Sequence, residues 1–217
     1  HPGAAEKVYE AQCEGYEVSA ETCGHYLAFT EDDVLEHGAL FKCAPPLRTK
    51  DDVEAMWEYV EEGVFSGLAS DHSPCTYDEK NNEILGQKIE NVFDVWGGIS
   101  GIQSCVQAIY SEGVVKRGVD PRVLANAWAK LPAETFHIYG RKGDIKVGFD
   151  ADIVIIDPER EWEITADSLY YVNKISAFVG MKGKGFPVVT LVRGELMAED
   201  GKLVGLKGKG ELIKRLF

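Results

Sequence analysis

The chain has 217 residues, and 45% of them are hydrophobic, which is enough to bury a packed core. Its formal net charge of -13 argues against nucleic acid or an anionic membrane as a partner, because both need clustered lysine and arginine. No apolar run reaches the roughly 18 residues of a membrane span, and the start lacks a signal-peptide pattern. These properties predict a soluble protein with no nucleic-acid or membrane partner.

The five cysteines are an odd number and include no C-x-x-C pair. A disulfide framework or a structural zinc site is therefore not expected, and a reducing, cytoplasmic location is the simpler prediction. Cys43 or Cys75 could act as a nucleophile, but small packing residues near a pocket are the commoner use of such cysteines.

The first elements alternate between helix and strand. Ala4–Glu14 carries a helical stripe that stops at Gly15, and Tyr16–Thr22 is typical of a strand. Because no strand precedes the first helix, the sequence resembles a repeating βα fold that is entered partway round.

The next stretch contains a loop with two prolines. Thr30 is expected to cap a short helix that runs to Glu36, and Leu40–Cys43 is expected to be extended. Pro45 and Pro46 then fix the backbone direction next to Ala44. Such a loop suits either a rigid turn or the presentation of main-chain groups to a ligand.

Lys50–Glu62 predicts a helix that packs through apolar residues spaced three and four apart, namely Val53, Met56, Trp57 and Val60. A short apolar strand at Gly67–Ser70 follows and stops on Asp71. In βα barrels the active site forms at the C-terminal ends of the strands, so Asp71 is the first candidate for chemistry. The alternative is a helix cap or an Asx-turn.

The following region is predicted to be a polar loop at 76–91, then a glycine-rich stretch from Phe93 to Gly101, then helices at 102–114 and 121–130. The glycines around Gly97 would let backbone approach either a helix or a ligand. From Gly143 the residues become typical of β-structure, with a strand at Ala151–Asp157 and a hairpin that begins at Val188. A basic tail at 207–214 is expected to end in a short helix.

Three motifs occur in order: ETCGHYL at 21–27, KCAPPLR at 42–48 and GLASDHSPC at 67–75. Together they resemble the cyclic amidohydrolases, and within that family the allantoinase group. The resemblance implies an α/β fold, in which residues 1–142 form the C-terminal part of a (β/α)8 TIM barrel and residues 143–217 form part of a small β-sandwich.

The resemblance also implies a reaction and a set of site residues. The reaction is the hydrolysis of a cyclic ureide or imide, first of all allantoin to allantoate, by water activated at a binuclear divalent metal centre. Zinc is the expected metal, with manganese, cobalt or iron as alternatives. Asp71 would bind metal and move the proton. Ala44 and Gly97 would contact substrate through their backbone, and His72 would orient Asp71 or a substrate oxygen unless it only makes a structural hydrogen bond.

The other metal ligands of the family lie outside these residues, and the resemblance does not make His25 one of them. The family uses a His-x-His pair, a carbamylated lysine and two later histidines, whereas none of the five histidines here forms a His-x-His pair. The resemblance therefore covers only the C-terminal half of such an enzyme. A hydantoinase-like or dihydroorotase-like hydrolase and a non-catalytic scaffold with this fold remain alternatives, and a homo-oligomer, a tetramer in the family, is expected.

Overall fold

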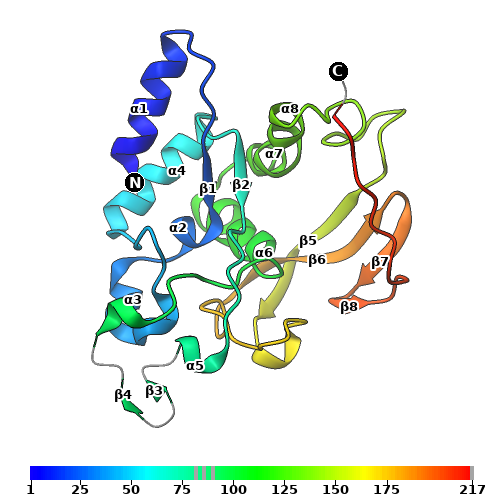
Figure 1. Cartoon of the computed structure of the whole chain (residues 1–217). Coiled ribbons are helices and arrows are strands. Elements are labelled where there is room, and N and C mark those ends of the chain that lie inside the picture. The colour runs from blue at the N-terminus through cyan, green and yellow to red at the C-terminus, as the bar shows by residue number, and fades with distance from the viewer. Residues whose placement is uncertain (81–82, 85–86, 89–90, 216–217) are drawn as a thin grey trace.

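The computed structural model describes residues 1–80, 83–84, 87–88 and 91–215 (Figure 1). Its first part consists of helices and two short strands: α1 Pro2–Cys13, β1 Glu21–Cys23, α2 Gly24–Ala28, α3 Glu31–His37, α4 Lys50–Glu61 and β2 Gly67–Ala69. Within the described part of the chain, no helix is both long and apolar enough to span a membrane.

Strands β1 and β2 lie side by side and run parallel, with Glu21 opposite Gly67 and Cys23 opposite Ala69 (Figure 1). The strand predicted before Asp71 is therefore confirmed. The strand predicted over Tyr16–Thr22 is wrong before Glu21. There the side chains of residues 16–19 are exposed, and the carbonyl of Val18 accepts a hydrogen bond from the Gln12 side chain instead of from a neighbouring strand.

Helix α4 confirms the predicted stripe, because Val53, Met56, Trp57 and Val60 are its buried residues. Thr49 and Asp52 form a capping box at its start, in which each side chain bonds the other residue's backbone. The Trp57 indole donates to the Leu27 carbonyl at 3.0 Å, which fixes α4 against the end of α2.

Helix α3 begins after Thr30, as predicted, but the extended stretch predicted over Leu40–Cys43 is wrong at Leu40 and Phe41; Lys42 has extended backbone. Gly38–Phe41 forms a 3-10 turn (η1) instead. The reason is packing, because Phe41 is buried and its ring meets the Phe29 ring edge-on at 5.0 Å. The turn therefore brings the Phe41 side chain into the hydrophobic core.

The polar region after Asp71 contains short elements that were not predicted: α5 Tyr77–Lys80, β3 Glu83–Ile84 and β4 Gln87–Lys88. Thr76 starts α5, because its backbone and hydroxyl both donate to the Glu79 carboxylate. Residues 81–82, 85–86 and 89–90 of the predicted loop lie outside the described residues. After η2 (Val92–Asp94) the chain follows the glycine stretch.

The helical region continues with α6 Cys105–Tyr110, η3 Ser111–Val115, α7 Pro121–Ala125, η4 Asn126–Lys130 and α8 Leu131–Thr135, in which η3 and η4 are π-helical. Asp120 caps α7 through its side chain, as predicted. The predicted start at Ile102 is wrong. The Gly101 carbonyl accepts from both Ser104 and Cys105, so a turn precedes the helix and leaves Ile102 exposed.

The last part is an antiparallel sheet in the order β5-β6-β7-β8, formed by β5 Ile153–Glu163, β6 Lys182–Val192, β7 Glu195–Glu199 and β8 Lys202–Leu203, with η5 Ala166–Ser168 between its first two strands. The predicted hairpin is confirmed by the pairing of β6 with β7, and the predicted strand at Ala151–Asp157 begins at Ile153 and continues past Asp157 through a β-bulge. The predicted C-terminal helix is wrong over the described residues. Glu211 there forms ion pairs with Arg141 and Arg193, which hold the segment along the surface.

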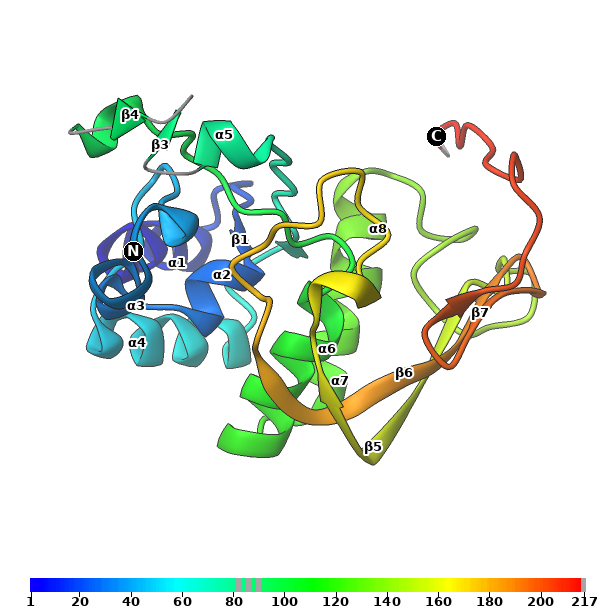
Figure 2. The same ribbon diagram turned by 90° about the horizontal axis from the view of Figure 1, so that it is seen from below.

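The sheet and the helical part share a hydrophobic core. In Figure 2, β5 and β6 pass alongside α6. Trp162 and Phe178 belong to the same buried cluster as Phe29, Phe41 and Ile99. The observed architecture therefore agrees with the predicted α/β class, with parallel βα units followed by a β-sheet packed against them.

Candidate functional site

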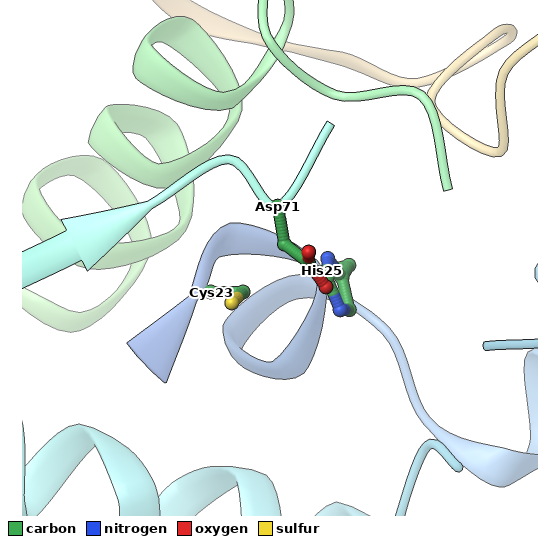
Figure 3. Close-up of side chains that lie close together, drawn as sticks. All are labelled: Cys23, His25 and Asp71. Atoms are coloured by element: carbon green, nitrogen blue, oxygen red, sulfur yellow. The ribbon is translucent and has the colours of Figure 1, made fainter. Parts of the chain in front are cut away.

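Asp71 lies two residues beyond the end of β2, beside the end of β1. Because β1 and β2 are parallel, their C-terminal ends meet at one edge. Asp71 has a φ of 42°, a left-handed conformation that aspartate tolerates better than most residues. Potential ligand atoms of Asp71, Cys23 and His25 all lie within 4.8 Å of one another (Figure 3). The strand ends therefore bring together a carboxylate, a thiol and an imidazole.

His25 is the most deeply buried member of this cluster, with 1% of its surface exposed. Neither ring nitrogen has a hydrogen-bond partner among the described residues. Burial lowers the pKa of His25 to about 4, although the charge of Asp71 acts in the opposite direction. The imidazole is therefore neutral near pH 7, which is the form that binds metals.

The cysteines near the site are protonated rather than reactive. Burial, followed by the charge of Asp71, raises the pKa of Cys23 to about 12. Burial also raises the pKa values of Cys43 and Cys75. Since the thiolate is the nucleophilic form, these shifts favour the packing role over the nucleophile role for Cys43 and Cys75.

The Cys23, His25 and Asp71 cluster suits a divalent metal ion of the zinc type. A carboxylate oxygen and a neutral imidazole nitrogen are zinc ligands as they stand, and the Cys23 thiol would become a third if an ion displaced its proton; a catalytic zinc uses three protein ligands. The two unpartnered nitrogens of His25 are polar atoms whose burial is costly unless something binds them. The residues present therefore fit a metal at the end of β1 and β2.

Ala44 and Gly97 lie next to each other although they come from different loops. A Cβ atom built on Gly97 would be 3.5 Å from the Cβ of Ala44. Both residues line one open groove of about 1150 Å³. Asp71 is not among the described residues that line this groove, so the cluster at the strand ends and the groove are two separate features.

Tyr26 connects these two features. Its ring centroid lies 4.2 Å from that of His25. Its hydroxyl donates to the Pro45 carbonyl at 2.8 Å, in the loop that carries Ala44. Burial raises the pKa of Tyr26, so the hydroxyl stays protonated and keeps this donor.

His72 makes backbone contacts on the segment that leads to α6. Its Nδ1 accepts from the Gly101 amide at 3.2 Å and from the Ile102 amide at 3.4 Å. Its ring centroid lies 4.9 Å from that of Tyr171, and burial lowers its pKa. These contacts favour the structural hydrogen bond for this nitrogen, and a substrate contact by His72 stays a prediction.

The sequence interpretation singled out Asp71 but not its two neighbours in the cluster. His25 lies just after β1, as Asp71 lies just after β2. The rule that barrel chemistry gathers at the C-terminal strand ends therefore also applies to Cys23 and His25. Applied to each strand in turn, this rule would have selected all three residues.

Comparisons with known proteins show the family of the chain. The model of the amidohydrolase family matches residues 14–197. The chain is 41% identical over 190 residues to an allantoinase of Enterococcus faecalis, covering 88% of this chain and 40% of that protein. It is also 41% identical over 197 residues to an allantoinase of Rubrobacter xylanophilus, covering 91% of this chain and 42% of that protein.

Solved structures give the same fold. An L-hydantoinase (dihydropyrimidinase) from Arthrobacter aurescens superposes with a TM-score of 0.92 at 32% identity, covering 99% of this chain and 46% of that one. A D-hydantoinase superposes with a TM-score of 0.88 at 33% identity. The chain thus spans less than half the length of these relatives, and the fold class predicted from the motifs is confirmed.

Proposed function

Because the chain belongs to the amidohydrolase family, whose members depend on metals, we propose that it forms part of an enzyme that hydrolyses a cyclic amide. The proposed substrate is allantoin, which would be opened to allantoate. The observation that carries this proposal is the position of Asp71, whose carboxylate lies beside the neutral, buried His25 at the joined ends of two parallel strands. Two allantoinases at 41% identity support the choice of substrate.

The metal centre is the second part of the proposal. Asp71 matches the family's ligand position, and His25 and Cys23 offer neighbouring donor atoms. A bound ion lowers the pKa of a water molecule and polarises the carbonyl of the cyclic amide. We propose two ions, zinc in preference to manganese, cobalt or iron, with the remaining ligands and the carbamylated lysine on residues outside this chain.

Asp71 itself would move the proton. A carboxylate at this position can accept a proton from the attacking water and deliver it to the nitrogen that leaves when the ring opens. The amide nitrogen is a poor leaving group without that proton. The Asp71 carboxylate is exposed at the edge where the two strands end, so water and substrate can reach it.

The neighbouring loops would hold the substrate. Ala44 and Gly97 would bind the cyclic ureide through main-chain groups, which suits an imide because it presents both donors and acceptors. Tyr26 would hold the Ala44 loop at a fixed distance from the cluster. His72 would contribute through the nitrogen that does not accept the Gly101 and Ile102 amides.

A hydantoinase-like activity is the second candidate, because the superposed structures are hydantoinases with TM-scores of 0.92 and 0.88. Allantoin and hydantoins share the cyclic ureide, so the same backbone contacts could bind either. We further propose a role in ureide catabolism, a cytoplasmic location and a homo-oligomeric assembly, on the basis of the family.

The test is a substrate panel on the purified natural full-length protein. The rates of hydrolysis of allantoin, hydantoin, dihydrouracil and dihydroorotate are compared before chelation, after chelation, and after zinc, manganese or cobalt is restored. The proposal predicts the highest kcat/KM for allantoin, loss of activity on chelation, and recovery with metal. Activity that resists complete metal removal, or no turnover of any of the four compounds, would contradict it.

A further inference from the structure

Lys80 is a buried cation at the end of α5, with 5% of its surface exposed. Its ammonium donates to three backbone carbonyls: to Lys42 at 2.6 Å, to Gly98 at 2.7 Å and to Trp96 at 3.1 Å. An ammonium has three N–H donors, so all of them are used on main-chain oxygens.

The three acceptors surround the backbone positions assigned to substrate binding. Lys42 lies two residues before Ala44, and Trp96 and Gly98 lie on either side of Gly97. A single ammonium therefore joins the two loops at the place where Gly97 contacts Ala44. The Trp96 carbonyl belongs to the peptide group that precedes Gly97, and the Lys42 and Gly98 carbonyls lie one peptide group further from Ala44 and Gly97.

Other hydrogen bonds also hold α5, Lys42 and the glycine stretch together. The Glu79 carbonyl accepts from the Trp96 amide at 2.9 Å, which attaches the glycine stretch to α5. The Lys42 ammonium donates to the carbonyl of Phe93 at 3.1 Å and to that of Val95. Lys42 thus tethers the same segment, and its Cε lies 3.8 Å from a Cβ built on Gly97.

A buried lysine is a costly way to fill space. Burying a charged group is unfavourable unless its hydrogen bonds are satisfied, and an apolar residue of similar size is often as stable. Burial lowers the pKa of Lys80 to about 8, which reports this cost. Unlike an apolar side chain such as methionine, the Lys80 ammonium binds three backbone carbonyls and so fixes the directions in which they point.

We propose that Lys80 is a positioning residue that sets the spacing and direction of the Ala44 and Gly97 main-chain groups for binding of the cyclic ureide. This inference rests on the proposed function, because the substrate role of the two loops belongs to it. Lys80 does not touch the substrate. It acts through the carbonyls on both sides of the binding backbone.

The test replaces Lys80 by methionine in the natural full-length protein and measures kcat, KM and metal content with allantoin. Since the backbone contacts bind substrate and transition state alike, KM should rise about 10- to 100-fold while kcat changes less than about threefold. Metal content should not change. Lys7→Met is the control, and its KM should change less than about twofold, because the exposed Lys7 ammonium pairs with Glu10 on α1, away from both loops.

Amide hydrogen exchange gives a second readout that does not need activity. In Lys80→Met, the segments 43–47 and 95–98 should exchange faster together, while α4 keeps its protection; Lys80→Gln, which retains two donors, should show a smaller change. If Lys80→Met does not fold, KM and hydrogen exchange are both measured on Lys80→Gln instead.

An unchanged KM with unchanged exchange in both segments would overturn the proposal for Lys80. A wild-type protein that turns over no cyclic ureide would instead overturn the proposed function, and exchange would still decide whether Lys80 fixes the loops.

Discussion

The carboxylate of Asp71 and the imidazole of His25 face each other across the ends of two parallel strands, with ligand atoms no more than 4.8 Å apart (Figure 3). The parallel register of β1 and β2 produces this relationship, because it places both strand ends at one edge. A neutral buried imidazole and an exposed carboxylate thus share a site that could bind a metal ion.

The burial of His25 predicts a pH-dependent stability. Its folded pKa of about 4 lies below the value of 6.5 for an exposed histidine, so the unfolded chain binds the proton more readily. The stabilisation is complete above pH 6.5 and is lost as the pH falls toward 4. For metal-free protein we expect the free energy of unfolding to decrease by on the order of 3 kcal/mol across that window.

Denaturant melts at a series of pH values measure this dependence. His25→Phe, which keeps a ring of similar size, should reduce the slope, and His37→Gln, on the exposed end of α3, should keep it. Equal slopes in wild type and His25→Phe would show that His25 is not buried in its neutral form.

The sequence predicted the elements whose own pattern determines them. The apolar stripe of α4 and the strand that ends before Asp71 are visible in the residues themselves. The parallel pairing of β1 with β2 is also expected of a repeating βα fold, and this pairing puts Asp71 at the C-terminal ends of both strands. The motif resemblance then supplied the fold class, which the superposed hydantoinase structures confirm.

The errors arose where distant contacts decide the local structure. Gly38–Phe41 turns because Phe41 packs on Phe29, and no local pattern encodes that contact. Lys80 lies in a stretch that looked like a polar loop, and its role depends on carbonyls far along the chain. The C-terminal tail follows ion pairs of Glu211 rather than its own helical pattern.

Two neighbouring glycines should respond differently to the same substitution. A Cβ on Gly98 would lie 2.2 Å from the Ser73 hydroxyl and 2.5 Å from its Cβ, whereas on Gly97 the nearest atom is 3.5 Å away. Gly98→Ala should therefore destabilise the protein by about 1–3 kcal/mol, as overpacking does, and Gly97→Ala by clearly less. Thermal melts of both variants test this order. The reverse order would mean that the Asp71 loop is not packed on the glycine stretch.

The 217-residue chain on its own should associate or aggregate. Within the described residues β1 pairs only with β2, so each strand of this parallel sheet has an open edge. Open edges recruit other strands, and parallel sheets are stable when they are extended and covered. Sedimentation velocity and thermal melting check this expectation. A monodisperse monomer with one sharp cooperative transition would contradict it.

The most direct test of the central claim is the Asp71→Asn variant of the natural full-length protein, assayed with allantoin and analysed for metal. Asparagine keeps the size of the side chain but removes its charge and basicity, so kcat should fall by roughly three orders of magnitude. Ala44→Gly, which keeps the backbone contact, should change kcat far less. If Asp71→Asn hydrolyses allantoin at nearly the wild-type rate with unchanged metal content, Asp71 is only a turn residue and the proposed mechanism is wrong.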